Sequence, residues 1–143
     1  MPLRSRPATA DPWSAHYADG LACHEVRLQR CGDCGFVRFP AAPFCPECWS
    51  ERFEWRVHRG TGRVTALVWY LEPQDPRFAD GPYNVALVRL DDGPVVVSNV
   101  VEVAREALRV GDRVVATFLD EPAGFSLLAF RPLAVAGSAA GER

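Results

Sequence analysis

Residues 31–48 read CGDCGFVRFPAAPFCPEC and hold two C-x2-C pairs ten residues apart. Each pair fits a tight turn, or knuckle, whose backbone amides point at the sulfurs, and two facing knuckles give the tetrahedral four-sulfur site of a zinc ribbon. Gly32, Gly35 and Pro46 suit such turns. The predicted metal ligands are Cys31, Cys34, Cys45 and Cys48.

A site of this kind is expected to be structural, because four sulfur ligands leave no coordination position for water or substrate. Zinc is the expected metal, although a tetrahedral four-sulfur site also accepts iron. The minor alternative is four cysteines without a metal, either reduced or joined in disulfides. Cys23 lies outside the spacing, and we expect a small buried apolar residue there rather than a nucleophile.

The N-terminus and the composition restrict compartment and partners. Residues 1–13 carry no apolar run after their arginines, and no stretch approaches the roughly 18 apolar residues of a membrane span, so a cytoplasmic protein without a membrane partner is expected. All 16 basic residues are arginine and the formal net charge is −2. Four thiolates and one zinc ion would take this charge to about −4, which disfavours nucleic acid as a partner.

The patterning divides the chain into four expected parts. These are an N-terminal arm and amphipathic helix (1–25), a zinc ribbon (26–52), an OB-fold (53–132) and a flexible tail (133–143). The helix is expected over residues 11–22, with Asp11 as N-cap and with Trp13, Tyr17 and Leu21 on one face. That face is expected to cover the chain's own ribbon, and the alternative is a partner surface.

After the ribbon, the apolar residues alternate with polar ones, which is typical of strands. The fold class is therefore predicted to be mainly β, with an N-terminal helix, a four-cysteine ribbon and a C-terminal five-stranded OB-fold barrel. The expected barrel strands are 64–71, 83–90, 95–101, 113–119 and 125–131, with a short helical or turn segment at 102–108. The loops 72–82 and 120–124 would lie on the ligand side.

Several landmarks in a fixed order carry a family resemblance. An aromatic helix and the zinc pairs precede Trp55, a G-x-G-x-V segment at 60–64, and Pro82-Tyr83 at a strand entrance. The later landmarks are Leu90-Asp91-Asp92-Gly93, Val110-Gly111-Asp112 and Phe130-Arg131-Pro132. Over roughly residues 11–132 the chain resembles the family called domain of unknown function thirty-five, whose members pair a rubredoxin-like zinc ribbon with an OB-fold.

The resemblance implies a non-catalytic partner of thiolase-fold enzymes that is associated with acyl-CoA. In some members the small protein bridges a thiolase and other enzymes and shelters CoA between them. In others the partner is a lipid-transfer-type thiolase homologue that acts as an aldolase on CoA thioesters of steroid side chains. The all-arginine composition indicates a GC-rich, actinobacterium-like genome and favours the aldolase partner.

The residues themselves also favour a non-catalytic protein. His16, His24 and His58 occur singly, and the spacing indicates no nucleophile beside a general base. Less favoured is a single-stranded nucleic-acid-binding OB protein, in which Trp69 and Tyr70 would stack on bases. An enzyme acting alone is the least favoured class.

One basic cluster, residues 52–63, offers a candidate ligand site. Its candidate contacts to CoA phosphates are Arg56, Arg59 and Arg63. Guanidinium groups bind phosphate oxygens in pairs, and the glycines of the G-x-G segment would permit a close backbone approach. The plainer interpretation, which the all-arginine composition favours, is a solvated outer strand face.

Overall fold

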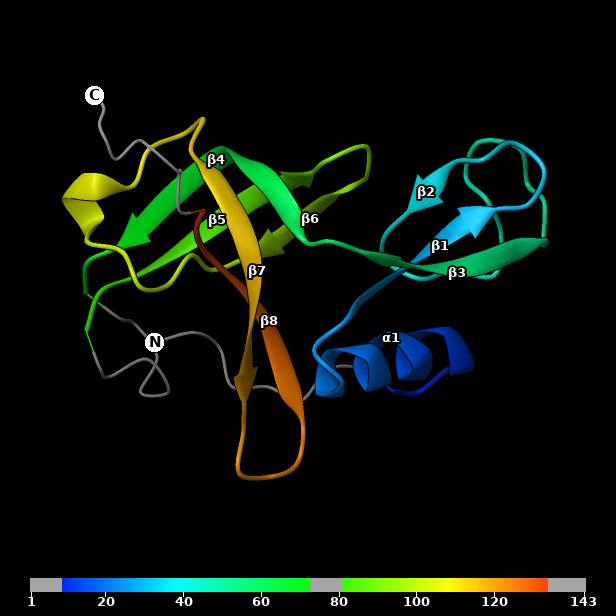
Figure 1. Ribbon diagram of the computed structural model, residues 1–143, viewed down its shortest axis with the longest axis horizontal. Helices are drawn as coiled ribbons and strands as arrows, with labels where there is room; N and C mark the ends of the chain where they lie inside the picture. Colours follow the sequence, from blue (N-terminus) through cyan, green and yellow to red (C-terminus); the bar gives the residue numbers. More distant parts are fainter. Residues whose placement is uncertain (1–8, 73–80, 134–143) are drawn as a thin grey trace.

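The computed structural model of this chain describes residues 9–72 and 81–133 (Figure 1). Those residues form one α-helix and two antiparallel sheets, a three-stranded sheet in the order β2-β1-β3 and a five-stranded sheet in the order β6-β5-β4-β7-β8. The mainly β fold class is therefore confirmed. The predicted tail beyond residue 133, the start of the N-terminal arm and most of the predicted 72–82 loop lie outside the described residues.

The elements follow the predicted order. They are α1 (Pro12–Ala22), β1 (Val26–Cys31), β2 (Val37–Arg38), β3 (Phe53–His58), β4 (Thr61–Tyr70), β5 (Tyr83–Leu90), β6 (Val95–Ser98), the 3-10 turn η2 (Arg105–Ala107), β7 (Arg113–Asp120) and β8 (Ser126–Pro132). Within the described ranges, no helix is long and apolar enough to cross a bilayer.

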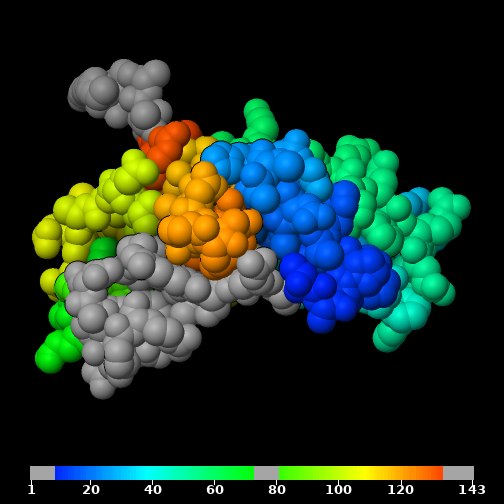
Figure 2. All heavy atoms as spheres, turned by 90° about the horizontal axis from the view of Figure 1, so that it is seen from below, coloured from blue at the N-terminus to red at the C-terminus, as the bar shows by residue number. Residues whose placement is uncertain are grey.

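Helix α1 begins at the predicted cap. The Asp11 carboxylate accepts a hydrogen bond of 2.8 Å from the Ser14 amide, and this bond lowers the pKa of Asp11. Tyr17 packs against Phe39 at a ring distance of 5.2 Å, burial raises its pKa, and Leu21 is buried. The helix contacts β1 of the ribbon and β8 of the barrel (Figures 1 and 2), so the prediction that it covers the chain's own ribbon is confirmed for Tyr17.

The five-stranded sheet curls into a half-barrel of the OB type. A bulge at Thr65 shifts the register of β4 against β5, so that Val64, Leu67 and Trp69 all turn toward the core. The two edges of the sheet approach each other just after β6. There the Val101 amide donates to the Phe130 carbonyl at 2.7 Å.

Ribbon and barrel share one hydrophobic core. Val26 and Leu28 from β1 are buried in the same cluster as Val64, Val88 and Phe130 of the barrel. Because these side chains exclude water together, the base of the ribbon is held on the barrel by packing. The orientation of the metal site therefore depends on the barrel.

A polar network fixes the connection between the two sheets. His58, the last residue of β3, places Nε2 2.7 Å from the Asp91 carbonyl, and its Nδ1 accepts from the Gly60 amide at 2.8 Å. The Asp91 carboxylate in turn accepts two hydrogen bonds of 2.7 Å from the Arg113 guanidinium and one of 2.7 Å from the Thr61 hydroxyl. The network joins the β3–β4 connection, the β5–β6 turn and β7.

One sequence expectation differs from the structure in this part of the fold. The strand expected over 95–101 ends at Ser98, because the chain then turns across to β8 and passes Glu102 at a φ of 59°. The short helical or turn segment expected over 102–108 is present as the single 3-10 turn Arg105–Ala107. The end of the strand accompanies the closing contact with Phe130, which no local pattern encodes.

The prediction for Cys23 is wrong. This residue is the C-cap of α1, its amide donates to the Gly20 carbonyl at 2.9 Å, and its side chain is exposed. Helix α1 ends at Ala22, and the Cys23 side chain lies outside the core.

Candidate metal centre

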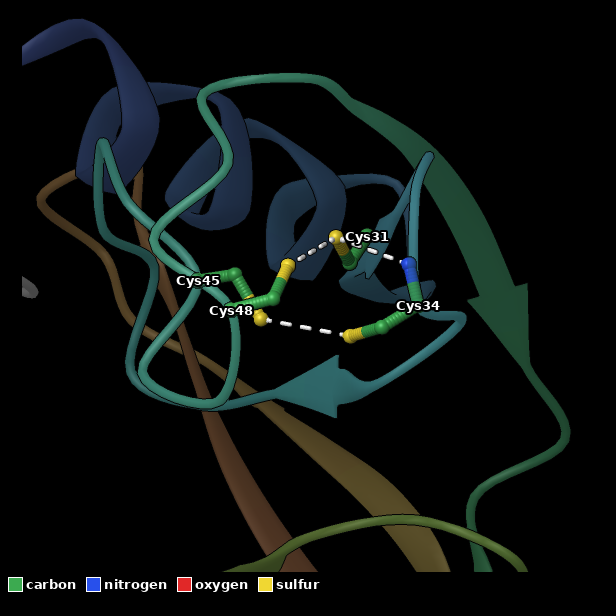
Figure 3. A group of neighbouring side chains, drawn as sticks. All are labelled: Cys31, Cys34, Cys45 and Cys48. Atoms are coloured by element: carbon green, nitrogen blue, oxygen red, sulfur yellow. Dashed lines mark hydrogen bonds between the residues drawn. The ribbon is translucent and has the colours of Figure 1, made fainter.

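The four predicted ligands lie together between the two knuckles of the ribbon (Figure 3). All four Sγ atoms lie within 4.8 Å of one another, with 3.5 Å between Cys31 and Cys48 and 3.6 Å between Cys34 and Cys45. A zinc tetrahedron with bonds of about 2.3 Å has S–S edges of about 3.8 Å. The sulfurs are therefore spaced as a tetrahedral metal ion requires.

The two knuckles are built alike from their backbone hydrogen bonds. In the first, the Gly35 amide donates to the Cys31 carbonyl at 3.1 Å, and in the second the Trp49 amide donates to the Cys45 carbonyl at 2.8 Å. Each leading cysteine also donates its amide five residues ahead, to the Phe36 and Ser50 carbonyls respectively. This repetition brings the sulfurs of one knuckle opposite those of the other.

The fourth residue after each leading cysteine has a positive φ. In the first knuckle this is Gly35 at 81°, whereas in the second it is Trp49 at 64°. A bulky residue is costly in the left-handed region. Trp49 is also 76% exposed, so burial of its ring within this chain does not explain why it is there.

The pKa values of two of the four cysteine thiols favour a bound cation. The Cys34 amide, 3.4 Å from the Cys31 sulfur, and the Asp33 amide at the same distance lower the pKa of Cys31 to about 6. At Cys48 the Ser50 amide favours the thiolate, but desolvation and the three neighbouring sulfurs outweigh it and raise the pKa to about 12. Four thiolates cannot be ionised side by side without a compensating positive charge, so the donor set fits a bound metal ion.

The three predicted phosphate contacts lie in separate settings. The Arg56 guanidinium pairs with Glu54 at 2.8 Å on the exposed side of β3. Arg63 on β4 donates to the Gly111 carbonyl at 2.6 Å. Within the described part of the chain, Arg59 in the β3–β4 connection has no hydrogen bond or ion pair. Nothing in these contacts tests phosphate binding, which stays a prediction.

The glycines of the G-x-G segment allow close approach within the chain itself. A Cβ on Gly62 would lie 2.5 Å from the Arg89 carbonyl oxygen, and one on Gly60 would lie 2.6 Å from the Ala116 Cβ. Gly60 also has a φ of 80°. The packing of β4 on β5 and β7 therefore explains both glycines without a ligand.

Sequence reasoning missed a row of arginines on the outside of the barrel. In the strand register, Arg63 on β4 lies directly opposite Arg89 on β5 and Arg113 on β7. Asp91 neutralises Arg113 through two hydrogen bonds, whereas no described residue forms an ion pair with Arg63 or Arg89. The only signal that could have found this row is the pairing of the strands.

The structure also brings together a serine, an aspartate and a histidine that are remote in sequence. His24 stacks on Phe118, and its Nε2 lies 2.9 Å from Asp120, which accepts a 2.6 Å hydrogen bond from the Ser126 hydroxyl. In an acyl-transfer triad the histidine must contact the serine hydroxyl to remove its proton. Here Ser126 donates to Asp120 instead, so the cluster ties α1 to the β7–β8 hairpin and activates no nucleophile.

Fold and site together define a class of protein in which a four-cysteine ribbon precedes an OB-fold. A family model described as "ChsH2, rubredoxin-like zinc ribbon domain" matches residues 18–54, and one described as "ChsH2, C-terminal OB-fold domain" matches residues 55–119. A DUF35 domain-containing scaffold protein of Methanothermobacter thermautotrophicus is 33% identical over 62% of this chain and 68% of its own length. The chain belongs to the DUF35 family.

Other relatives are longer. The chain is 35% identical over 91% of its length to a probable enoyl-CoA hydratase alpha subunit of Thermomonospora curvata. It is 31% identical over 83% of its length to the 3-oxo-4,17-pregnadiene-20-carboxyl-CoA hydratase alpha subunit of Mycobacterium tuberculosis. The matches span only 40% and 37% of those two proteins.

Two solved structures share the fold. A chain of the "Ltp2-ChsH2(DUF35) aldolase" is 33% identical, with a TM-score of 0.79 over 89% of this chain and 98% of that one. A DUF35 protein of Sulfolobus solfataricus is 17% identical with a TM-score of 0.62 over 85% of this chain and 86% of that one. The second likeness concerns the fold alone.

Proposed function

We propose that this chain is a non-catalytic subunit that binds and supports a thiolase-fold enzyme acting on acyl-CoA substrates. The partner we propose is a lipid-transfer-type aldolase of steroid side-chain degradation in the cytoplasm. The observation that carries this proposal is the likeness, over nearly the whole of both chains, to a chain of the Ltp2-ChsH2(DUF35) aldolase. The name of the Mycobacterium relative, a hydratase subunit for a steroid-type CoA thioester, agrees with it.

The chemistry of the described residues supports an accessory role. Four sulfur ligands would leave a metal ion no open position. The Ser126–Asp120–His24 contacts have the wrong connectivity for nucleophilic catalysis. Chemistry on the thioester is therefore assigned to the partner.

The metal we propose is structural zinc, held by all four cysteines of the ribbon. Zinc prefers thiolate ligands in tetrahedral geometry, and its charge would allow the neighbouring sulfurs to ionise together. Cys31 and Cys45 are buried while Cys34 and Cys48 are exposed, so the ion would lie near the surface of the ribbon. Its work would be to hold the two knuckles together.

Direct contact with acyl-CoA is a further part of the proposal. Arg59 is the strongest of the three candidates, because Arg56 is paired with Glu54 and Arg63 with a backbone carbonyl. Separate replacement of Arg56, Arg59 and Arg63 by alanine should weaken retention of acyl-CoA by the complex in at least one case. Unchanged affinity in all three variants would remove direct phosphate contact by these residues.

A second candidate function is an acyl-CoA-sheltering bridge in a thiolase complex. The scaffold-protein names of the relatives from Methanothermobacter thermautotrophicus and Pyrococcus furiosus favour it. Nucleic-acid binding has less support, because Trp69 packs against the core and is not available as a stacking platform.

Capture of partners on the tagged full-length chain in native extract, followed by mass spectrometry, tests the proposal. The expected result is co-purification of a thiolase-fold enzyme in stoichiometric amount. An aldolase homologue would support the first candidate, and a thiolase together with a second enzyme would support the bridge. Recovery of no thiolase-like protein, together with absence of acyl-CoA binding, would overturn both.

A further inference from the structure

The outer face of strands β4, β5 and β6 is apolar over most of its length. The register places Tyr70 beside Tyr83, Val68 beside Val85, and Ala66 beside Leu87, which in turn lies beside Val97 on β6. Their neighbours along the strands, including Val88 and Ala86, point to the core. These strands are therefore apolar on both sides, whereas a solvated outer face normally carries polar side chains.

Four side chains of this face are exposed and the others are half-buried. Val97 is 66% exposed, Val68 54%, Tyr70 43% and Leu87 37%, and the rings of Tyr70 and Tyr83 stack at 5.0 Å. An exposed apolar patch that continues across neighbouring strands is typical of an interaction site. We call these seven residues the outer β face: Ala66, Val68, Tyr70, Tyr83, Val85, Leu87 and Val97.

Two positively charged arginines border one end of the outer β face. Arg63 and Arg89 lie directly opposite each other on β4 and β5. Within the described residues, the Arg89 side chain has no hydrogen bond or ion pair, and the Arg63 side chain donates only to the Gly111 carbonyl. Like charges placed opposite each other destabilise a sheet, so the isolated chain gains nothing from this arrangement.

A cleft continues from this charged end toward the ribbon. It measures about 410 Å³ and is lined by Arg89, Leu90, Asp92 and Gly93 of the barrel and by Phe36 and Val37 of the ribbon. Phe36 is 37% exposed at this position. An occupant of the outer β face could therefore also reach the ribbon that the metal site holds in place.

We propose that the outer β face is the docking surface for the partner enzyme, and that the partner presents an apolar patch flanked by acidic side chains. The inference rests on the proposed function and specifies its interface. Apolar contact removes the exposed valines and leucine from water, and carboxylates of the partner neutralise Arg63 and Arg89. The arginines then fix the orientation of the complex.

A second copy of this chain fits the same surface less well. The outer β face and its arginine border contain no acidic residue. Two such faces packed on each other would bury both arginine pairs without a carboxylate, which is costly. The charge therefore selects a different protein with acidic groups.

The apolar part of the inference is tested by a matched pair of substitutions, Val97→Asp and Val57→Asp. Val97 on β6 is 66% exposed, and Val57 on the edge strand β3 of the ribbon is 61% exposed. Titration calorimetry with the thiolase-fold enzyme that co-purifies with the wild-type chain should show Val97→Asp binding at least about tenfold more weakly and Val57→Asp within about twofold of wild type. Equal affinities of the two variants would overturn the inference.

The charged part is tested with Arg89→Glu against Arg105→Glu, since neither side chain has a partner among the described residues and Arg105 is exposed on the η2 turn. Arg89→Glu should weaken partner binding by about tenfold and reduce its dependence on salt, while Arg105→Glu should not. If Arg89→Glu still binds the partner but no longer binds acyl-CoA, the inference is overturned and this end of the face is assigned to a phosphate group. The isolated chain could instead form a dimer that Val97→Asp abolishes while partner binding stays intact. That result would overturn the inference and assign the face to a second copy.

Circular dichroism and thermal unfolding accompany each variant, so that lost binding is credited only to a folded chain. Failure of the proposed function is distinguishable from failure of this inference. A wild-type chain that binds no thiolase-fold enzyme removes both. If the wild-type chain, Val97→Asp and Arg89→Glu all bind the enzyme equally well, only the proposed docking surface is refuted.

Discussion

Asp91 joins three parts of the chain that are remote in sequence. Its carboxylate bonds to Arg113 and to Thr61, and its carbonyl lies 2.7 Å from His58. The Arg113 guanidinium, followed by the Thr61 hydroxyl, holds the pKa of Asp91 well below its ordinary value of 3.8. The ionised form is thus favoured in the folded state, and its contribution to stability is lost as pH falls from the ordinary value toward the folded one.

This sign gives a prediction for pH. Asp91→Asn should lower the melting temperature at pH 7, and its stability should fall less steeply than that of wild type as pH drops below about 4. Asp92→Asn is the control, because Asp92 is exposed and its φ of 51° suits asparagine. Thermal unfolding followed by circular dichroism between pH 3 and 7 measures both, and parallel curves for wild type and Asp91→Asn would contradict the assignment.

The cysteines give the second residue-scale prediction. Cys45→Ser should lose bound zinc and unfold at lower temperature, because one buried ligand of four is removed. Cys23→Ser, which changes an exposed thiol outside the cluster, should keep the full zinc content. Elemental analysis after gel filtration provides the measurement and also distinguishes zinc from iron. Full zinc content in Cys45→Ser would refute the ligand set.

At the scale of elements, the close pairing of β4 with β5 depends on Gly62. A Cβ at this position would meet the Arg89 backbone oxygen at 2.5 Å, so Gly62→Ala must shift one strand and should cost about 1–3 kcal/mol. In Gly93→Ala the new carbon comes no closer than 3.3 Å to the Leu90 Cβ, and a smaller cost is expected. Urea unfolding compares the two variants, and equal stabilities would show that the strands have room to move.

The ribbon and the barrel should respond differently to removal of the metal. The knuckle amides of Asp33, Cys34 and Glu47 donate to sulfur, whereas Val26 and Leu28 at the base of the ribbon lie in the barrel core. Chelation should therefore speed hydrogen exchange across residues 31–50 by tenfold or more, while strands β4 and β5 stay protected. Uniform loss of protection would mean that the metal stabilises the whole fold.

The elements were predictable where the signal is local. The cysteine spacing predicts the ribbon because both knuckles form within a few residues, and Asp11 predicts the start of α1 because a cap contacts the next turn. Contacts between remote segments were not predictable. The end of β6 and the position of Arg63 opposite Arg89 both depend on which strands become neighbours.

The site shows the same division between local and remote signals. Spacing alone predicted that the four sulfurs lie together, whereas the left-handed conformation of Trp49 carries no sequence marker. The G-x-G segment was interpreted as room for a phosphate, but Gly60 and Gly62 meet Ala116 and the Arg89 carbonyl. A glycine pattern indicates that another group approaches the backbone closely. Only the fold shows that this group belongs to the same chain.

At the scale of the whole molecule, the described parts of the ribbon and the barrel are joined into one unit. The shared core and the Asp91 network fix the ribbon on the barrel, and the cleft beside Arg89 joins the two. A partner can therefore bind ribbon and barrel together as one rigid surface, which lowers the entropic cost of binding. This arrangement agrees with a subunit that supports an enzyme.

The most direct test is to titrate the purified, zinc-loaded chain into its thiolase-fold partner and to measure aldol cleavage of a CoA thioester of a steroid side chain. We predict no turnover by the chain alone, low activity of the partner alone, and activity that rises with added chain and saturates at a fixed stoichiometry. Turnover by the chain alone, or partner activity that does not change at saturating concentrations of the chain, would contradict the account.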